Sequence, residues 1–222
     1  MAAPTVVQTA DATASAATTG VVTFATGVAN VDVTAGNAVI VVLADNGSAA
    51  ATYSISTTDG QTYTEITGIS DSGRTIRMWY KLAHPGGPAI ITVTASTADT
   101  FSVCALESNV NTVSVGATNM NNNVTSHHCA ASGSIDTTTD VLVVSAGSMT
   151  GSGDTLTENA SYTQLNTGNL SHTVVQYRTS AAALTDERAT YTGLVNRYSI
   201  AMVQAFQLVP TFTFVPQVIM VL

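Results

Sequence analysis

Short runs of apolar and β-branched residues recur along the whole chain, and turn-forming residues separate them. Runs of four to eight residues rich in Val, Ile, Thr and Tyr, bounded by Gly, Asn, Asp and Ser, are typical of β-strands. They occupy residues 21–25, 38–44, 52–57, 62–67, 75–82, 89–95, 101–107, 113–118, 140–146, 161–165, 172–178, 189–192 and 198–208. No window carries the stripe and caps of an amphipathic helix. The pattern therefore predicts an all-β protein.

Differences between these runs predict how each one is covered. Residues 38–43 and 141–144 are continuously apolar, so each is expected to be a strand buried on both faces. Residues 75–80 alternate more, which favours one solvent-facing side. An Asp-Gly pair at 59–60 lies between two strand-like runs and predicts a tight hairpin. Residues 84–88 place two prolines around two glycines and predict a loop.

The second half of the chain repeats the order of segments in the first half, offset by about one hundred residues. The matched segments are 37–42 with 140–144, 62–66 with 161–165, 78–81 with 175–178, 90–94 with 189–192, and 101–106 with 198–203. A duplication explains this pattern, and so do two halves of one sandwich that supply matching strands. We expect one jelly-roll-like β-sandwich over residues 21–209, with halves at about 21–118 and 135–209 and an N-terminal arm at 1–20.

Residues 210–222 form a second expected arm, which is apolar and carries no charged side chain. Left in water, such a segment promotes aggregation, and Pro210 and Pro216 disfavour a central strand. We expect it to dock in a groove of a neighbouring subunit or to add to its sheet edge. The alternative is that it packs along its own sandwich. The apolar residues expected to make the contact are Phe212, Phe214, Val215, Val218, Ile219, Met220 and Leu222.

The chain carries little charge, which limits its partners. Charged residues make up 9% of the 222 residues and the net charge is −8, whereas a typical domain has roughly 25% charged residues. The six Lys and Arg residues form no cluster, so we expect neither nucleic acid nor an acidic membrane as a partner. The first residues lack the features of a signal peptide, and we expect synthesis in a host cytoplasm.

No pattern predicts a catalytic site, a cofactor or a metal centre, so we expect a protein that is not an enzyme. Four carboxylates considered as a glycosidase pair show no supporting spacing: Glu65, Asp71, Asp99 and Glu107. His127, His128 and Cys129 are potential zinc ligands, but a strand would place neighbours on opposite faces, and a polar loop is favoured. The turns at 45–47 and 71–73 have residue types that suit calcium but lack an EF-hand order.

Cysteine and aromatic residues are interpreted mainly as packing groups. Cys104 lies in an apolar alternating run and is expected in the core, with a bridge to Cys129 left open. Aromatic residues could stack on sugars, but core packing is favoured over this role. The candidates are Tyr53, Tyr63, Trp79, Tyr80, Tyr162, Tyr177 and Tyr191.

A succession of segments carries a family resemblance. They are AGNAVIVVLA, DGQTYTEI, RTIRMWYKL, AIITVTAS, TFSVCALES, TTDVLVVSAG, SYTQLNTG, SHTVVQYR and YSIAMVQAFQL. This succession, over residues 36–208, resembles a β-sandwich domain of bacterial surface proteins and phage structural proteins. The resemblance implies a jelly-roll-like fold and roles in surface display, adhesion or virion decoration. It departs from the pattern at residues 107–110, where an acidic-aromatic-Gly turn is usual.

The leading interpretation is a virion structural protein, namely a phage capsid-decoration or surface protein on the virion. It would form a homo-oligomer, such as a trimer, and bind a capsid or other virion protein. A carbohydrate-binding or adhesin module that recognises surface glycans is the alternative. A glycan-degrading enzyme is a third hypothesis. A capsid shell protein is also considered, although residues 1–20 lack the basic residues that such shells use to hold a genome.

Overall fold

The structure is a computed structural model that describes residues 3–25, 31–45, 47, 51–71, 73–121, 135–149, 161–166, 172–185, 187 and 199–209. Eleven strands make up the regular structure of these residues, which confirms the all-β prediction. They are β1 Val6–Phe24, β2 Ala38–Asp45, β3 Tyr53–Thr57, β4 Thr64–Asp71, β5 Arg74–Lys81, β6 Ala89–Ser108, β7 Thr112–Asn121, β8 Val141–Met149, β9 Thr163–Gln164, β10 Thr173–Ser180 and β11 Ser199–Gln207. Across the described ranges, no helix of membrane-spanning length and apolarity occurs.

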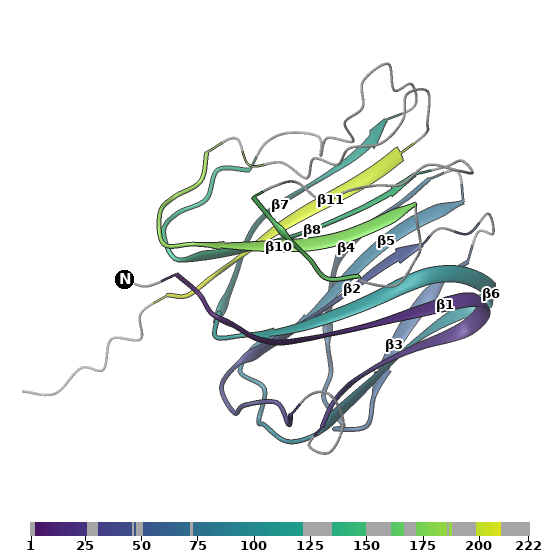
Figure 1. The fold of residues 1–222 in the computed structure, drawn as a ribbon, viewed down its shortest axis with the longest axis horizontal. Helices are drawn as coiled ribbons and strands as arrows, with labels where there is room; N and C mark the ends of the chain where they lie inside the picture. Colours follow the sequence, from purple (N-terminus) through teal and green to yellow (C-terminus); the bar gives the residue numbers. More distant parts are fainter. Residues whose placement is uncertain are drawn as a thin grey trace, which may run out of the picture.

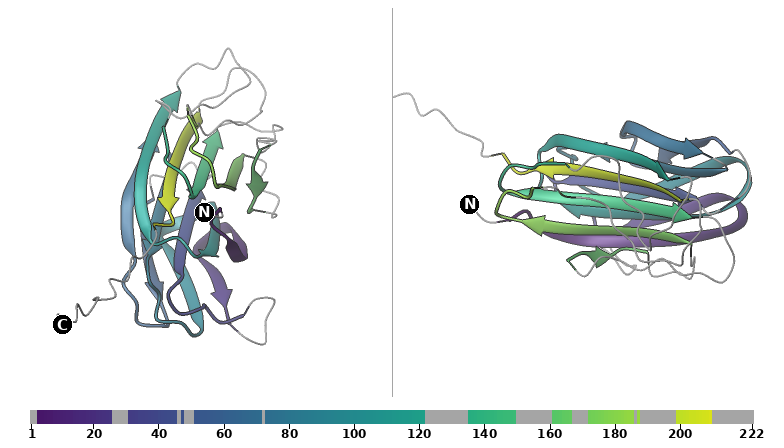
Figure 2. Two further views of the ribbon diagram at one scale, coloured as in Figure 1. Left: turned by 90° about the vertical axis from the view of Figure 1, so that its left-hand side faces the viewer. Right: turned by 90° about the horizontal axis from the view of Figure 1, so that it is seen from above.

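The strands form two antiparallel sheets that pack face to face (Figures 1 and 2). The first sheet has the order β1-β6-β2-β5-β4, with β3 also paired to β6, and the second has the order β7-β11-β8-β10-β9. Four of the five segment pairs of the sequence echo occupy equivalent places in the two orders, and the fifth includes residues 189–192, which lie outside the described residues. The jelly-roll connectivity is not confirmed, because the chain completes the first sheet at Ser108 before it begins the second at Thr112. A duplication stays a prediction.

The core between the sheets is built by the continuously apolar strands. Ile40 and Val42 of β2 and Leu142 and Val144 of β8 are fully buried within it. Every residue of β2 and β8 is buried, which confirms the prediction that both strands are covered on both faces. Phe206 of β11 also packs in this core and meets Tyr80 edge-on, with the ring centroids 6.0 Å apart.

The outer face of the first sheet is covered as well, because the long β1–β6 pair bends back over it (Figure 1). β6 pairs with β2 over residues 101–108 but with β3 over residues 91–95. Register shifts in β1 between Ala14 and Thr19 accompany the bend, as bulges do in other sheets. Val41 and Trp79 pack beneath the folded part, and we call this apolar cluster the outer core.

Three local predictions are wrong. The expected N-terminal arm supplies most of β1, which pairs with β6 along nearly its whole length. The Asp-Gly pair at 59–60 does not close a hairpin, since β3 pairs with β6 whereas β4 pairs with β5. β5 does not have the predicted solvent-facing side, because Met78 faces the core between the sheets and Trp79 faces the outer core. All three outcomes depend on pairing and packing between residues distant in sequence.

Candidate functional site

The first sheet ends in a long strand with one hydrogen-bonded neighbour. β1 spans 19 residues and lies at the end of the strand order, and among the described strands it pairs with β6 alone. Natural edge strands are usually short or carry Lys or Pro, because unpaired backbone groups invite another strand. β1 contains no Pro or Lys, and its single charged residue is Asp11. The protections seen in the described residues include register shifts against β6, one between Val6 and Gln8 and two between Ala14 and Thr19, and a contact of Gln8 with Val31.

Apolar side chains lie exposed around this edge. Val7 and Val21 of β1 are each 46% exposed, and Val31, beside Gln8, is 56% exposed. Ile90 of β6 is 38% exposed and lies opposite Thr23, on the same side of the β1–β6 pair as Val21. Single exposed apolar residues are normal on proteins. Here they follow a strand edge with a single charged residue, so strand and side chains together form a candidate contact surface.

The end of β11 lies beside the start of β1 (Figure 1). Val209 exchanges hydrogen bonds with the Asn111 side chain, at 2.9 Å through its N–H and 2.7 Å through its carbonyl oxygen. Two residues earlier, the Asn109 side chain accepts a hydrogen bond from the Thr5 N–H at 2.8 Å. The expected arm at 210–222 therefore starts close to the candidate surface. The arm itself, with all seven of its named apolar residues, lies outside the described residues.

The candidate carboxylates lie apart. Glu65 is on the surface of β4, where it accepts a hydrogen bond from Arg77 at 2.7 Å. Glu107 and Asp99 are buried at different positions along β6. Asp71 ends β4, and its side chain is outside the described part. The structure thus does not unite Glu65, Asp99 and Glu107 in one cleft.

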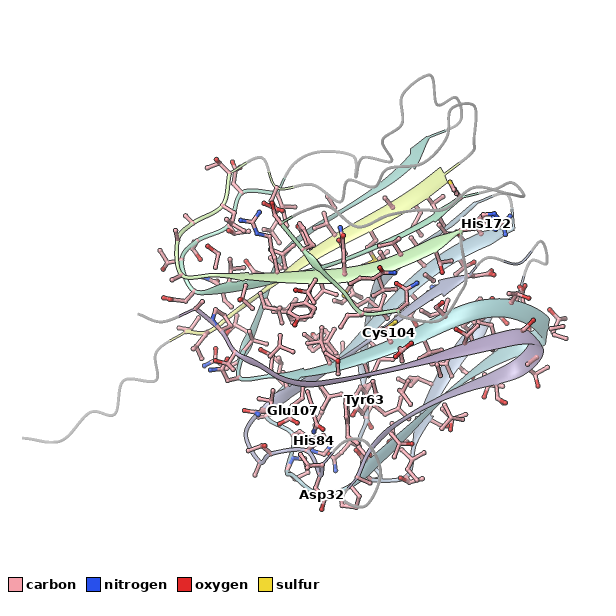
Figure 3. All side chains as sticks on the ribbon, in the orientation of Figure 1. Asp32, Tyr63, His84, Cys104, Glu107 and His172 are labelled. Carbon is pink, nitrogen blue, oxygen red and sulfur yellow. The ribbon has the colours of Figure 1, made fainter. Side chains whose placement is uncertain are left out.

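Glu107 is an internal hydrogen-bond acceptor that joins three segments. Its side chain accepts hydrogen bonds from the Gln8 amide at 2.6 Å, the Asn37 amide at 2.6 Å and the Thr34 N–H at 2.9 Å. Figure 3 shows it near His84 and Tyr63 at one end of the first sheet. These contacts fasten β1 and residues 31–37 to β6. Glu107 is fully buried, and such donors offset the cost of burying a carboxylate.

A second polar contact fixes the loop at 84–88, which the structure confirms as a loop. His84 is fully buried, and its Nδ1 accepts a hydrogen bond from the Gly86 N–H at 3.0 Å. We therefore assign the ring proton to Nε2, which lies 2.8 Å from Asp59 Oδ2 and donates to it. Burial opposes ionisation of Asp59, but hydrogen bonds from Thr57, the Gln61 N–H and His84 together lower its pKa. Because His84 is enclosed, this arrangement stabilises a corner of the fold.

The remaining candidates are mostly packing groups. Trp79 is buried in the outer core, as predicted, and none of the aromatic residues with a described side chain is fully exposed. Cys104 is a free thiol in the core between the sheets, and burial raises its pKa. His127, His128, Cys129 and Tyr191 lie outside the described residues. Within the described ranges, no three His, Cys, Asp or Glu side chains converge as a metal site.

Two features were missed in the sequence. The edge of β1 went unrecognised because its Ala- and Thr-rich run lacks a strong apolar pattern and was interpreted as an arm. The second feature is a group of the buried residues Asp45, Arg74 and Asp99 with the partly buried Tyr53. Its members come from four strands. The sequence presents the turn at 45–47, Asp99 and Tyr53 as separate candidates, and no local pattern joins them.

Comparisons with protein-family models, with curated proteins and with solved structures find no match to this chain. The resemblance to β-sandwich domains of phage and bacterial surface proteins stays a prediction. The function must therefore be argued from the geometry and the composition of the chain.

Proposed function

We propose that this protein is a structural subunit of a phage particle, a capsid-decoration or surface protein that assembles with further copies of itself and with a capsid protein. The observation that carries the proposal is the 19-residue edge strand β1, with its single charged side chain and its exposed valines. The role would be mechanical: subunits add buried area to a lattice and to one another, and so stabilise the particle.

Strand addition suits this edge for a physical reason. A strand laid along β1 would satisfy backbone groups that otherwise face water, and main-chain hydrogen bonds would supply affinity. Burying the edge would remove few charges from water, so the desolvation cost that opposes many polar interfaces would be small. Residues 210–222 match these requirements in composition, since they carry no charge and are largely apolar. A neighbouring copy's segment 210–222 is therefore the partner we favour for β1.

The proposal is tested by native mass and particle binding. Sedimentation velocity should show an oligomer for the full chain and smaller species after residues 210–222 are deleted, with circular dichroism unchanged. Thr13→Lys places a charge on the exposed face of β1 and should weaken assembly and co-sedimentation with phage particles. Thr94→Lys is the matched control. Thr94 is also exposed, but it lies on β6 between Thr19 of β1 and Ser54 of β3, so it is not at a strand edge and its change should not affect assembly.

Two results would contradict this function. One is a full chain that stays monomeric at every concentration and binds no particle. The other is an unchanged oligomer in both the deletion and the Thr13→Lys variant, which would leave the particle role open but reject β1 and residues 210–222 as the contact.

A further inference from the structure

One corner of the first sheet gathers buried polar groups from four strands. Asp45 is the last residue of β2, Tyr53 the first of β3 and Arg74 the first of β5. Asp99 lies in β6 opposite Ala17, within the region of register shifts where the β1–β6 pair bends. Asp45 is 0% exposed, Asp99 5% and Arg74 9%. The corner therefore joins the flat part of the sheet to the part that folds back over it.

Both carboxylates approach Gly47. Asp45 Oδ1 accepts a hydrogen bond from the Gly47 N–H, and Asp99 Oδ1 packs so close that a Cβ on Gly47 would clash with it. Asp99 also accepts from the Tyr53 hydroxyl at 3.2 Å and from the Thr100 N–H at 2.7 Å. Gly47 thus permits an approach of two acidic side chains that any larger residue would prevent.

One oxygen of this group lacks a donor. Asp45 Oδ2 is buried and has no hydrogen-bond partner, although its residue is wholly enclosed. A buried carboxylate oxygen without a donor is costly, and native structures usually satisfy such atoms with a proton, water or an ion. Desolvation raises the pKa of Asp45 to about 6, and the Asp99 charge acts in the same direction. The Tyr53 hydroxyl and the Arg74 charge act in the opposite direction but do not cancel this rise.

Arg74 offsets part of this charge but leaves an excess. Its guanidinium donates to the Gly47 carbonyl oxygen, and its charge favours ionisation of Asp45 less than burial opposes it. With both aspartates ionised, two negative charges stand beside one positive charge. Neither His nor Cys belongs to the group, and its free ligand atoms are oxygens. Hard cations such as Ca²⁺ prefer carboxylate, hydroxyl and carbonyl oxygens and tolerate irregular coordination.

We propose that this corner binds one Ca²⁺ ion through Asp45 Oδ2 and the Asp99 carboxylate, and that the ion fastens the bend of the β1–β6 pair to β2. Water and backbone oxygens would complete the coordination, as in other calcium sites of few carboxylates. Because Arg74 reduces the net charge, we expect weak binding, with a Kd of about 10⁻⁴–10⁻³ M as in extracellular modules. The inference concerns the stability of the fold and does not depend on the proposed assembly.

The test uses the full chain after removal of divalent ions with EDTA. Ca²⁺ should raise the Tm by several degrees and bind at one ion per chain in equilibrium dialysis, whereas Mg²⁺ at the same ionic strength should have a much smaller effect. Asp45→Asn should remove both responses and still fold, because its side-chain oxygen can still accept from the Gly47 N–H. Glu65→Gln, which changes an exposed carboxylate on β4, should retain them.

Three results would overturn the proposal: no calcium-specific rise in the wild-type Tm, an equal response to Mg²⁺, or a calcium response that persists in Asp45→Asn. If Asp45→Asn fails to fold, dialysis of Asp99→Asn replaces it, and binding that survives in that variant counts against the site. If protonation alone neutralises the Asp45 carboxylate, the stability of the protein will depend on pH but not on calcium, and the proposal is wrong.

Discussion

Glu107 and Asp45 are buried carboxylates at opposite ends of the outer core, and they differ in how many hydrogen bonds they accept. Glu107 lies opposite Val39 near the start of β2, and Asp45 ends β2 opposite Phe101. Both are 0% exposed. Glu107 accepts three hydrogen bonds from side chains and backbone, whereas Asp45 accepts one at Oδ1 and none at Oδ2.

The difference shows that burial alone does not set the cost of an internal charge. Donors around Glu107 replace the water it loses, so the carboxylate holds β1 and residues 31–37 in place. Asp45 loses the same water but gains fewer donors and lies near a second acid, so its ionised form is penalised. The Glu107 carboxylate is satisfied by donors within the protein. The Asp45 carboxylate makes stability depend on pH and, as we propose, on cations.

The largest effect should come from Glu107→Ala. The change leaves the Gln8 amide, the Asn37 amide and the Thr34 N–H without their acceptor and opens a cavity. We expect the free energy of unfolding, measured with urea at neutral pH, to fall by about 3–5 kcal/mol. Glu65→Ala, at an exposed pair, should change it by less than about 1 kcal/mol. A loss below about 1 kcal/mol for Glu107→Ala would contradict the anchoring role.

A moderate effect should come from pH in calcium-free buffer. The pKa of Asp45 is raised from 3.8 to about 6, so the folded state holds the proton more tightly than the unfolded chain does. Its stabilisation is complete below about pH 4 and is lost as the pH rises through about 6. We expect the free energy of unfolding to fall by about 1–3 kcal/mol over this range.

Asp45→Asn isolates this contribution, because it should remove most of the dependence between about pH 4 and 7 while Glu65→Gln keeps it. Asp59 does not interfere in this window: its pKa is lowered, so its stabilisation is lost only at pH values below its ordinary pKa of 3.8. An identical pH profile in the wild type and Asp45→Asn would show that Asp45 is compensated by a group other than a proton.

The smallest effect should come from Tyr53→Phe. The variant loses the hydroxyl that donates to Asp99 but keeps the edge contact between ring 53 and Phe101, whose centroids lie 5.4 Å apart. We expect thermal or urea unfolding to show a loss of about 1 kcal/mol. Tyr80→Phe is the matched control, since its ring packs on Phe206, and it should change stability by less than about 0.5 kcal/mol. Equal losses in both variants would mean that the hydroxyl of Tyr53 adds nothing specific to this corner.

Neither the candidate contact surface nor the buried polar groups could be predicted from local patterns. Residues 1–20 contain no apolar run, so nothing local distinguishes the first part of β1 from an arm; pairing with the backbone of β6 makes it a strand. Glu107 looks like an ordinary residue at a strand end, and its burial depends on Gln8 and Asn37, which are distant in sequence. Asp45 and Asp99 meet only because β6 bends.

The sequence by itself determined the all-β class, the fully buried strands β2 and β8, the loop at 84–88 and the core position of Trp79. These follow from local rules, because continuous apolar runs must be covered on both faces and Pro-Gly clusters cannot continue a strand. The tertiary structure decided which strands pair, that β1 forms an exposed edge, and which carboxylates are satisfied. Those outcomes depend on contacts between residues distant in sequence, because the long bent strand β6 pairs with β1, β2 and β3 at different points along its length.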